Sequence, residues 1–142
     1  MNWLFVCTGN TCRSPMAAAC MRAAMDQRGL DGQVFSAGLA ADGSPATANA
    51  VAAMGEIGVD ISNHRSAPLT IERCQQADRI AVMTPAHKAV LAGAGVSVEK
   101  IIVLAEDSGG IADPYGGDME CYRTTRDQLM AEINRLLEKD GE

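Results

Sequence analysis

Four short apolar runs, separated by segments with helical patterns, constrain the fold of this chain most strongly. The runs are continuous rather than alternating, which is typical of strands that are covered on both faces. They span Trp3 to Val6, Val34 to Ala37, Ile80 to Met83 and Ile101 to Leu104. Strands and helices that alternate along the whole chain predict a parallel sheet with right-handed crossovers. Because 142 residues are the size of one ordinary domain, we expect a single α/β domain over residues 1–142.

Helical patterns fill the intervals between the runs. The first begins at Ser14, which we expect to cap the helix, and stops at Gly29. A second extends from near Ser44 to Gly58, and shorter helices are expected over 71–76 and 85–92. A long helix is expected over 122–139, where an apolar stripe would pack on the sheet. That stripe consists of Leu129, Met130, Ile133, Leu136 and Leu137.

Composition and charge exclude several classes of function. Twelve Lys and Arg against 18 Asp and Glu give a net charge of −6, and no basic cluster offers a track for a nucleic-acid backbone. The apolar start of the chain is too short for a signal peptide or a membrane span. Five cysteines are an odd number, which argues against a disulfide framework. We therefore expect a cytoplasmic protein with free thiols, no nucleic-acid partner and no membrane contact.

The segment VCTGNTCRSP, residues 6–15, joins the first predicted strand to the first predicted helix. Ligands of such sheets bind at the carboxyl ends of the strands. Gly9 and Asn10 readily accept unusual backbone angles, so the segment can curl into a ring with inward-pointing amides. The following helix start adds its own amides and the positive end of its dipole. We expect a hollow that binds a tetrahedral oxyanion such as phosphate. The ring residues expected to contact this ligand are Thr8, Gly9, Asn10, Thr11, Cys12 and Ser14.

Cys7 and Arg13 are the candidate catalytic residues of this ring. The amides, the helix start and the guanidinium all favour the thiolate of Cys7, which is the nucleophilic form. Arg13 has a fixed charge and a forked donor group, so it can hold two phosphate oxygens while the phosphoryl group becomes trigonal. A lone cysteine at a strand end is more often an inert core thiol. Here the thiol, the flexible pair, the arginine and the helix start share one short window, which favours a catalytic role.

Other motifs fit the window less well. It lacks the G-x-x-x-x-G-K-S/T loop that binds nucleoside triphosphates, and Gly93 and Gly95 do not form a dinucleotide fingerprint. Cys7 and Cys12 are separated by four residues rather than two, and a metal would lie beside the Arg13 cation, so we expect neither a zinc site nor a cofactor. A phosphate-binding module without activity stays open as an alternative.

CTGNTCRSP resembles the signature of the low-molecular-weight phosphotyrosine phosphatases. Three further matches follow in the order that this family shows: SAG at 36–38, HRS at 64–66 and DPYGG at 113–117. The resemblance thus covers nearly the whole chain. It implies four parallel strands in the order 2-1-3-4, with helices on both faces of the sheet.

The resemblance also implies a two-step hydrolysis without a cofactor. Cys7 attacks the phosphoryl group while Asp113 protonates the leaving group; Asp113 then activates the water that releases inorganic phosphate from the cysteinyl-phosphate. The residue before a proline is extended and the glycine pair allows a tight loop, so Asp113 is expected over the hollow together with Tyr115. Ser14 would donate a hydrogen bond to the Cys7 sulfur. The residues expected to support the ring from outside the hollow are Asn10, Ser36 and His64.

Two departures from the tyrosine-specific members bear on the substrate. Thr11 stands where those members usually carry an aliphatic residue, and Gly116 stands where they carry a second aromatic residue. Both changes make the pocket more polar, which suits the planar donor group of phosphoarginine better than the ring of phosphotyrosine. The pattern resembles the bacterial protein-arginine phosphatase branch. We expect an enzyme that removes phosphate from phosphoarginine in phosphorylated proteins, with protein-tyrosine phosphatase as the alternative.

Arsenate reduction is a further alternative on the same fold. It would need a cysteine pair that relays a disulfide, and the segment 79–88, where such reductases carry that pair, contains no cysteine. Cys74 and Cys121 are interpreted as packing or incidental thiols. Cys12 has two open interpretations: it captures an oxidised Cys7 as a disulfide and shields it, or it only packs in the ring.

Overall fold

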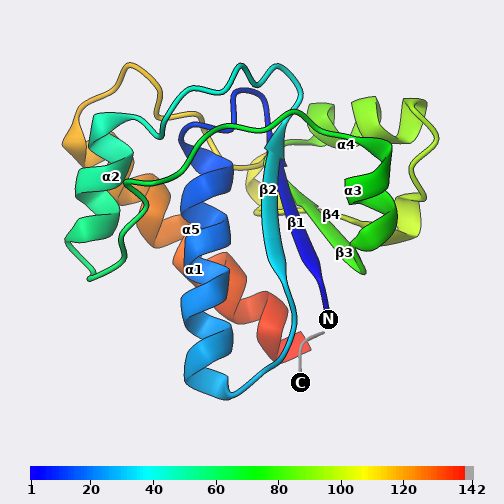
Figure 1. Cartoon of the computed structure of the whole chain (residues 1–142), viewed down its shortest axis with the longest axis horizontal. Coiled ribbons are helices and arrows are strands. Elements are labelled where there is room, and N and C mark those ends of the chain that lie inside the picture. Colours follow the sequence, from blue (N-terminus) through cyan, green and yellow to red (C-terminus); the bar gives the residue numbers. More distant parts are fainter. Residues whose placement is uncertain (140–142) are drawn as a thin grey trace.

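One four-stranded parallel sheet forms the centre of the computed structural model, which describes residues 1–139 (Figure 1). Its strands are β1 (Trp3–Cys7), β2 (Val34–Gly38), β3 (Arg79–Val82) and β4 (Ile101–Val103), in the spatial order β2-β1-β3-β4. The predicted order 2-1-3-4 is therefore confirmed. In the register of the ladder, Phe5 pairs with Ser36 on one side and with Ala81 on the other. The chain changes direction across the sheet at β1, and ligand sites of open α/β sheets lie at such a point.

Helices cover both faces of the sheet, as predicted. On one face lie α1 (Arg13–Arg28), α2 (Ala48–Gly55) and α5 (Met119–Lys139), and on the other lie α3 (Ile71–Gln76) and α4 (Pro85–Gly93) (Figure 1). Two short 3-10 helices, η1 (Val98–Lys100) and η2 (Glu106–Ser108), flank β4. Successive residues of β1 alternate between the two faces: Trp3 and Phe5 join the core under α1 and α5, whereas Leu4 and Val6 join the core under α3 and α4. The continuous apolar run of β1 therefore reflects the burial of this strand on both faces of the sheet.

The start of α1 differs from the prediction. The helix begins at Arg13, and Ser14 does not cap it. The Ser14 hydroxyl is instead within hydrogen-bond distance of Cys7 Sγ and of Asn10 Nδ2. A serine next to a proline is a good cap signal in sequence, but here the tertiary contacts of the ring use the hydroxyl first.

The start of α2 also differs from the prediction. The expected helix began near Ser44, but Pro45 forms an isolated bridge with Arg65. The helix starts behind Thr47, whose hydroxyl accepts a hydrogen bond from the Ala50 amide. Thr47 is therefore the N-cap, and the sequence interpretation placed the start one turn too early.

The predicted stripe of α5 is confirmed, and ion pairs add a second connection between α5 and α2. Leu129, Ile133 and Leu137 are buried, with Met130 and Leu136 packed against the same core. Glu56, directly after α2, accepts hydrogen bonds from Arg123 and Arg126 of α5.

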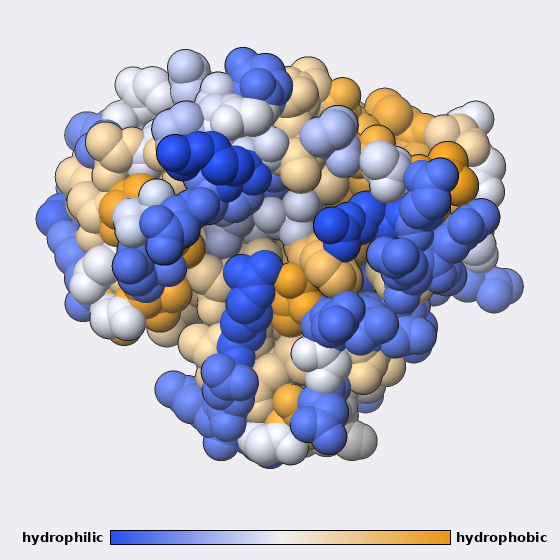
Figure 2. All heavy atoms as spheres, in the orientation of Figure 1, coloured by the Kyte–Doolittle hydropathy of each residue, from blue (hydrophilic) through white to orange (hydrophobic). Residues whose placement is uncertain are grey.

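The outer surface of the described chain is mixed in character. Figure 2 shows hydrophilic side chains over much of one face, with smaller apolar areas between them. None of the helices within residues 1–139 has the length and apolar character needed to cross a bilayer.

Candidate active site

The segment between β1 and α1 encloses a hollow of about 200 Å³ at the carboxyl end of the central strand. The hollow is lined by Cys7, Thr8, Gly9, Asn10, Thr11, Cys12, Arg13, Asp113 and Tyr115. Asn10 alone supplies the left-handed turn of the ring, with φ at +57°. Gly9 was expected to share this role, but its φ is not positive.

Amide groups of the ring are free to receive a ligand. Within residues 1–139, the backbone N–H groups of Thr8, Gly9, Thr11 and Cys12 donate to no protein acceptor. The first turn of α1 follows at once, and the amides of a first helical turn have no intrahelical acceptor. Such a group of amides, next to the positive end of a helix dipole, is suited to an oxyanion.

Cys7 lies at the floor of the hollow with two donors on its sulfur. Its Sγ lies 2.9 Å from Ser14 Oγ and accepts a hydrogen bond from the Asn10 amide at 3.2 Å. Ser14 Oγ itself accepts a hydrogen bond from Asn10 Nδ2 at 2.6 Å, which leaves the hydroxyl hydrogen free to be donated to the sulfur. The sulfur therefore lies within hydrogen-bond distance of one hydroxyl and one amide donor.

Arg13 lies at the buried end of the hollow, and Asp113 lies at its exposed mouth. Arg13 is 6% exposed, and its Nη1 donates to the carbonyl of Ile111 at 2.9 Å. Its Nη2 lies 3.6 Å from Asp113 Oδ2, and the Asp113 side chain is 51% exposed. Asp113 Oδ1 accepts a hydrogen bond from the Tyr115 amide at 3.1 Å. The carboxylate is therefore held at the mouth, with one oxygen facing inward and the Tyr115 ring exposed beside it.

Comparison with known proteins identifies the family. The model of the family described as low molecular weight phosphotyrosine protein phosphatase matches residues 2–140. The chain belongs to this family. A relative named protein-arginine-phosphatase, from Bacillus subtilis, is 40% identical over 149 residues, which cover 99% of each chain.

Two solved structures of this family superpose on nearly the whole phosphatase chain. One is a YwlE arginine phosphatase, a cysteine-to-serine mutant with a phosphorylated active-site serine; its TM-score is 0.92 at 39% identity, over 99% of this chain and 97% of that one. The other is a low molecular weight protein tyrosine phosphatase from T. tengcongensis, with a TM-score of 0.92 at 40% identity, over 98% and 99%. Relatives named for either substrate therefore share the fold of this phosphatase.

Hydrogen bonds of Asn10 connect the phosphatase ring to His64 and to the segment that follows it. His64 Nε2 lies 2.7 Å from the Asn10 carbonyl oxygen, and Asn10 Oδ1 accepts a hydrogen bond from the Ala67 amide at 2.9 Å. Both polar atoms of the buried Asn10 side chain have protein partners, Ser14 Oγ and the Ala67 amide, so this side chain supports the ring. The predicted supporting position of His64 agrees with this geometry.

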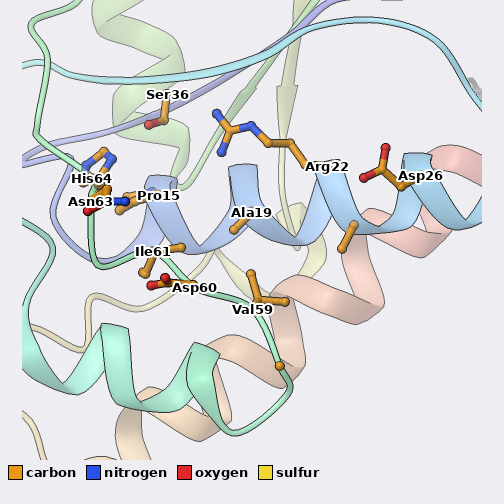
Figure 3. A pocket seen from close by; sticks show the side chains of 12 residues that line it. Pro15, Ala19, Arg22, Asp26, Ser36, Val59, Asp60, Ile61, Asn63 and His64 are labelled. Atoms are coloured by element: carbon orange, nitrogen blue, oxygen red, sulfur yellow. The ribbon is translucent and has the colours of Figure 1, made fainter.

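Ser36 lies apart from the ring, although it was predicted to support it. Its hydroxyl has no hydrogen-bond partner in the described part of the chain. It lines a separate cavity of about 500 Å³ between α1 and the segment 58–64, together with Arg22, Asp26 and His64 (Figure 3). That cavity is larger than the hollow but contains neither Cys7 nor Arg13, so the smaller hollow is the candidate active site.

Sequence reasoning missed the residues that surround the ring from distant parts of the chain. Cys12 lines the hollow, and its Sγ contacts two of these residues, Tyr122 Oη at 3.4 Å and Thr47 Oγ1 at 3.5 Å. Burial, followed by the Cys12 contact, raises the pKa of Tyr122 to about 12, so its hydroxyl stays protonated.

His87 is a second residue of this kind, and its Nε2 lies 2.9 Å from Thr8 Oγ1. No local pattern marks Tyr122, and the only signal for His87 is its place just after β3, at the same edge of the sheet.

Proposed function

We propose that this phosphatase hydrolyses phosphoarginine in proteins through a cysteinyl-phosphate intermediate. The observation that supports it best is the juxtaposition of a hydrogen-bonded thiol, a buried arginine and a mouth carboxylate around one hollow. The five free cysteines, four of them buried, favour a reducing compartment such as the cytoplasm.

In the first step, Cys7 Sγ attacks phosphorus and the bond from phosphorus to the guanidino nitrogen breaks. The free ring amides and Arg13 hold the three outer phosphoryl oxygens, whose charge is spread in the transition state. Asp113 donates its proton to the departing nitrogen, so the arginine side chain leaves without a negative charge. The exposed position of Asp113 at the mouth supports this role, because the leaving group would depart on that side.

In the second step, water attacks the phosphorus of the cysteinyl-phosphate and Asp113 accepts the proton. The bond between sulfur and phosphorus breaks, and Cys7 returns as a thiolate. The Ser14 hydroxyl and the Asn10 amide stabilise that thiolate as it leaves. Inorganic phosphate is the product.

The polar rim supports phosphoarginine over phosphotyrosine. The Thr11 hydroxyl has one weak partner, Cys12 Sγ at 3.9 Å, so it can accept a hydrogen bond from a guanidino N–H. Among the described residues that line the hollow, Tyr115 is the only one with an aromatic ring, and Gly116 adds no side chain beside it. The relatives named as arginine phosphatases agree with this preference.

Protein-tyrosine phosphatase is the second candidate. The ring of Tyr115 is 70% exposed at the mouth, where it could stack on an aromatic substrate. The similar T. tengcongensis structure is named for that activity.

Side-by-side turnover of phosphoarginine and phosphotyrosine peptides tests the proposal, with Cys7→Ser as the inactive control. We expect the parent enzyme to prefer phosphoarginine and Thr11→Ile to move the ratio of the two kcat/KM values toward phosphotyrosine. A parent that cleaves only phosphotyrosine defeats the arginine proposal and leaves the second candidate. Thioredoxin-dependent arsenate turnover would point instead to a reductase.

A further inference from the structure

His87 is a residue beside the active site whose chemistry the mechanism does not use. It lies in the first turn of α4, is 6% exposed, and contacts Thr8 Oγ1 through Nε2 at 2.9 Å. Among the side-chain nitrogen and oxygen atoms that are buried within residues 1–139, His87 Nδ1 is the only one without a hydrogen-bond partner. Buried polar atoms are nearly always paired, and an unpaired one lowers stability. Packing alone therefore does not explain a histidine at this position.

The surroundings of the ring determine where its proton lies. Burial, and then the charge of Arg13, lower the pKa of His87 from its ordinary 6.5, against the opposing effect of Asp113. The imidazole is therefore neutral near pH 7 and carries one hydrogen. On Nδ1 this hydrogen would be a buried donor without an acceptor, which is rarer in proteins than an unpaired acceptor. Placed on Nε2, it is donated to Thr8 Oγ1.

This hydrogen bond fixes the Thr8 hydroxyl at the rim. A hydroxyl oxygen has two acceptor positions, and His87 occupies one of them. In the described chain the hydroxyl has no other partner, so the second acceptor position is available to a ligand. Thr8 is exposed at the mouth, whereas Asn10 and Arg13 are buried. Thr8 lines the hollow at this exposed rim, where a group attached to phosphorus would lie.

We propose that His87 is a positioning residue that holds the Thr8 hydroxyl as an acceptor for a guanidino N–H of phosphoarginine. The pair then contributes to selectivity, because a guanidino group has N–H donors at that place and an aryl ring has none. The inference rests on the proposed arginine phosphatase activity. Thr8 touches the substrate, and His87 acts through Thr8.

The test compares kcat/KM for a phosphoarginine peptide with kcat/KM for p-nitrophenyl phosphate. In His87→Met and in Thr8→Val we expect the ratio of the two values to fall about fivefold to tenfold, the size of one neutral hydrogen bond. His87→Gln keeps a donor near the position of Nε2 and should restore most of the ratio. The double variant should lose no more than either single one, since both remove the same interaction. Val90→Ala, at an exposed position of the same helix, is the matched control.

Thermal unfolding separates positioning from packing. His87→Met removes the unpaired Nδ1, so its Tm should equal or exceed that of the parent while the ratio falls. A Tm of His87→Met that falls together with its kcat/KM for phosphoarginine overturns this inference and leaves the proposed function standing. Equal losses of kcat/KM on both substrates have the same consequence. A parent enzyme that turns over p-nitrophenyl phosphate but no phosphoarginine overturns both.

Discussion

Replacing Asn10 by alanine removes the side chain that connects the ring around the hollow to the rest of the protein. The buried amide donates to Ser14 Oγ at 2.6 Å and accepts from the Ala67 amide at 2.9 Å. The backbone of the same residue has φ at +57°, a region that asparagine and glycine tolerate better than alanine. The substitution therefore removes two hydrogen bonds and adds backbone strain at one position.

Each of these effects has an approximate size. A net contribution of about 1 kcal/mol for each hydrogen bond, and about 1 kcal/mol for alanine in the left-handed region, predict a loss of about 3 kcal/mol in the free energy of unfolding. Glycine avoids the strain of about 1 kcal/mol but loses about 0.5 kcal/mol more chain entropy on folding, so Asn10→Gly should be more stable than Asn10→Ala by about 0.5 kcal/mol. Because the Asn10 amide and the free amides of the ring would shift relative to Cys7, kcat/KM should fall by about 100-fold.

Urea unfolding and steady-state kinetics on the same samples check both values. Asn63→Ala is the matched control, because Asn63 is an exposed asparagine whose side chain makes no hydrogen bond in the described residues. If Asn10→Ala unfolds at the same urea concentration as the parent, the ring does not depend on these contacts and the reasoning is wrong. If Asn10→Gly is less stable than Asn10→Ala, the strain argument alone fails.

Three further substitutions test other parts of the molecule. Asp113→Asn should slow phosphoarginine hydrolysis by about 10²- to 10⁴-fold, because no acid protonates the leaving group; an unchanged steady-state rate contradicts that role. Hydrogen bonds from Arg123 lower the pKa of Glu56 from 4.5 to about 2, so the carboxylate stabilises the fold above pH 4.5 and loses this effect as the pH falls toward 2. The Tm difference between the parent and Glu56→Gln should shrink over that window, and a constant difference refutes it. Cys12→Ser should recover less activity with thiol after peroxide treatment if Cys12 captures the oxidised Cys7 as a disulfide; equal recovery argues against capture.

The alternation of apolar runs and helical patterns was enough to predict the fold class. Strands that are apolar at every position must be buried on both faces of the sheet. Only a few arrangements of alternating helices and strands bury both faces in this way. The spatial order of the strands came from the family resemblance instead. Local chemistry also predicted the hollow, since Cys7, Asn10 and Arg13 lie within seven consecutive residues and their relative positions follow from one turn and one helix start.

Helix starts were predicted less well, because the residues that mark them also have other partners. Ser14 next to a proline is a strong cap signal, yet its hydroxyl contacts Cys7 and Asn10. Thr47 is the actual cap of α2, and a second good signal at Ser44 lies just before it. Capping propensity shows which residues are good candidates for the N-cap. Their competing tertiary contacts determine which candidate caps the helix.

By itself, the sequence determined the fold class and the place of Cys7 and Arg13 around one hollow, because these depend on hydrophobic pattern and on contacts between near neighbours. Only the tertiary structure decided what surrounds the ring: Tyr122 against Cys12, His87 against Thr8, and Ser36 in a different cavity. Those contacts join residues that are up to 110 positions apart, and no local periodicity carries information about them. They depend on which strand edges and helix starts the packed sheet brings together.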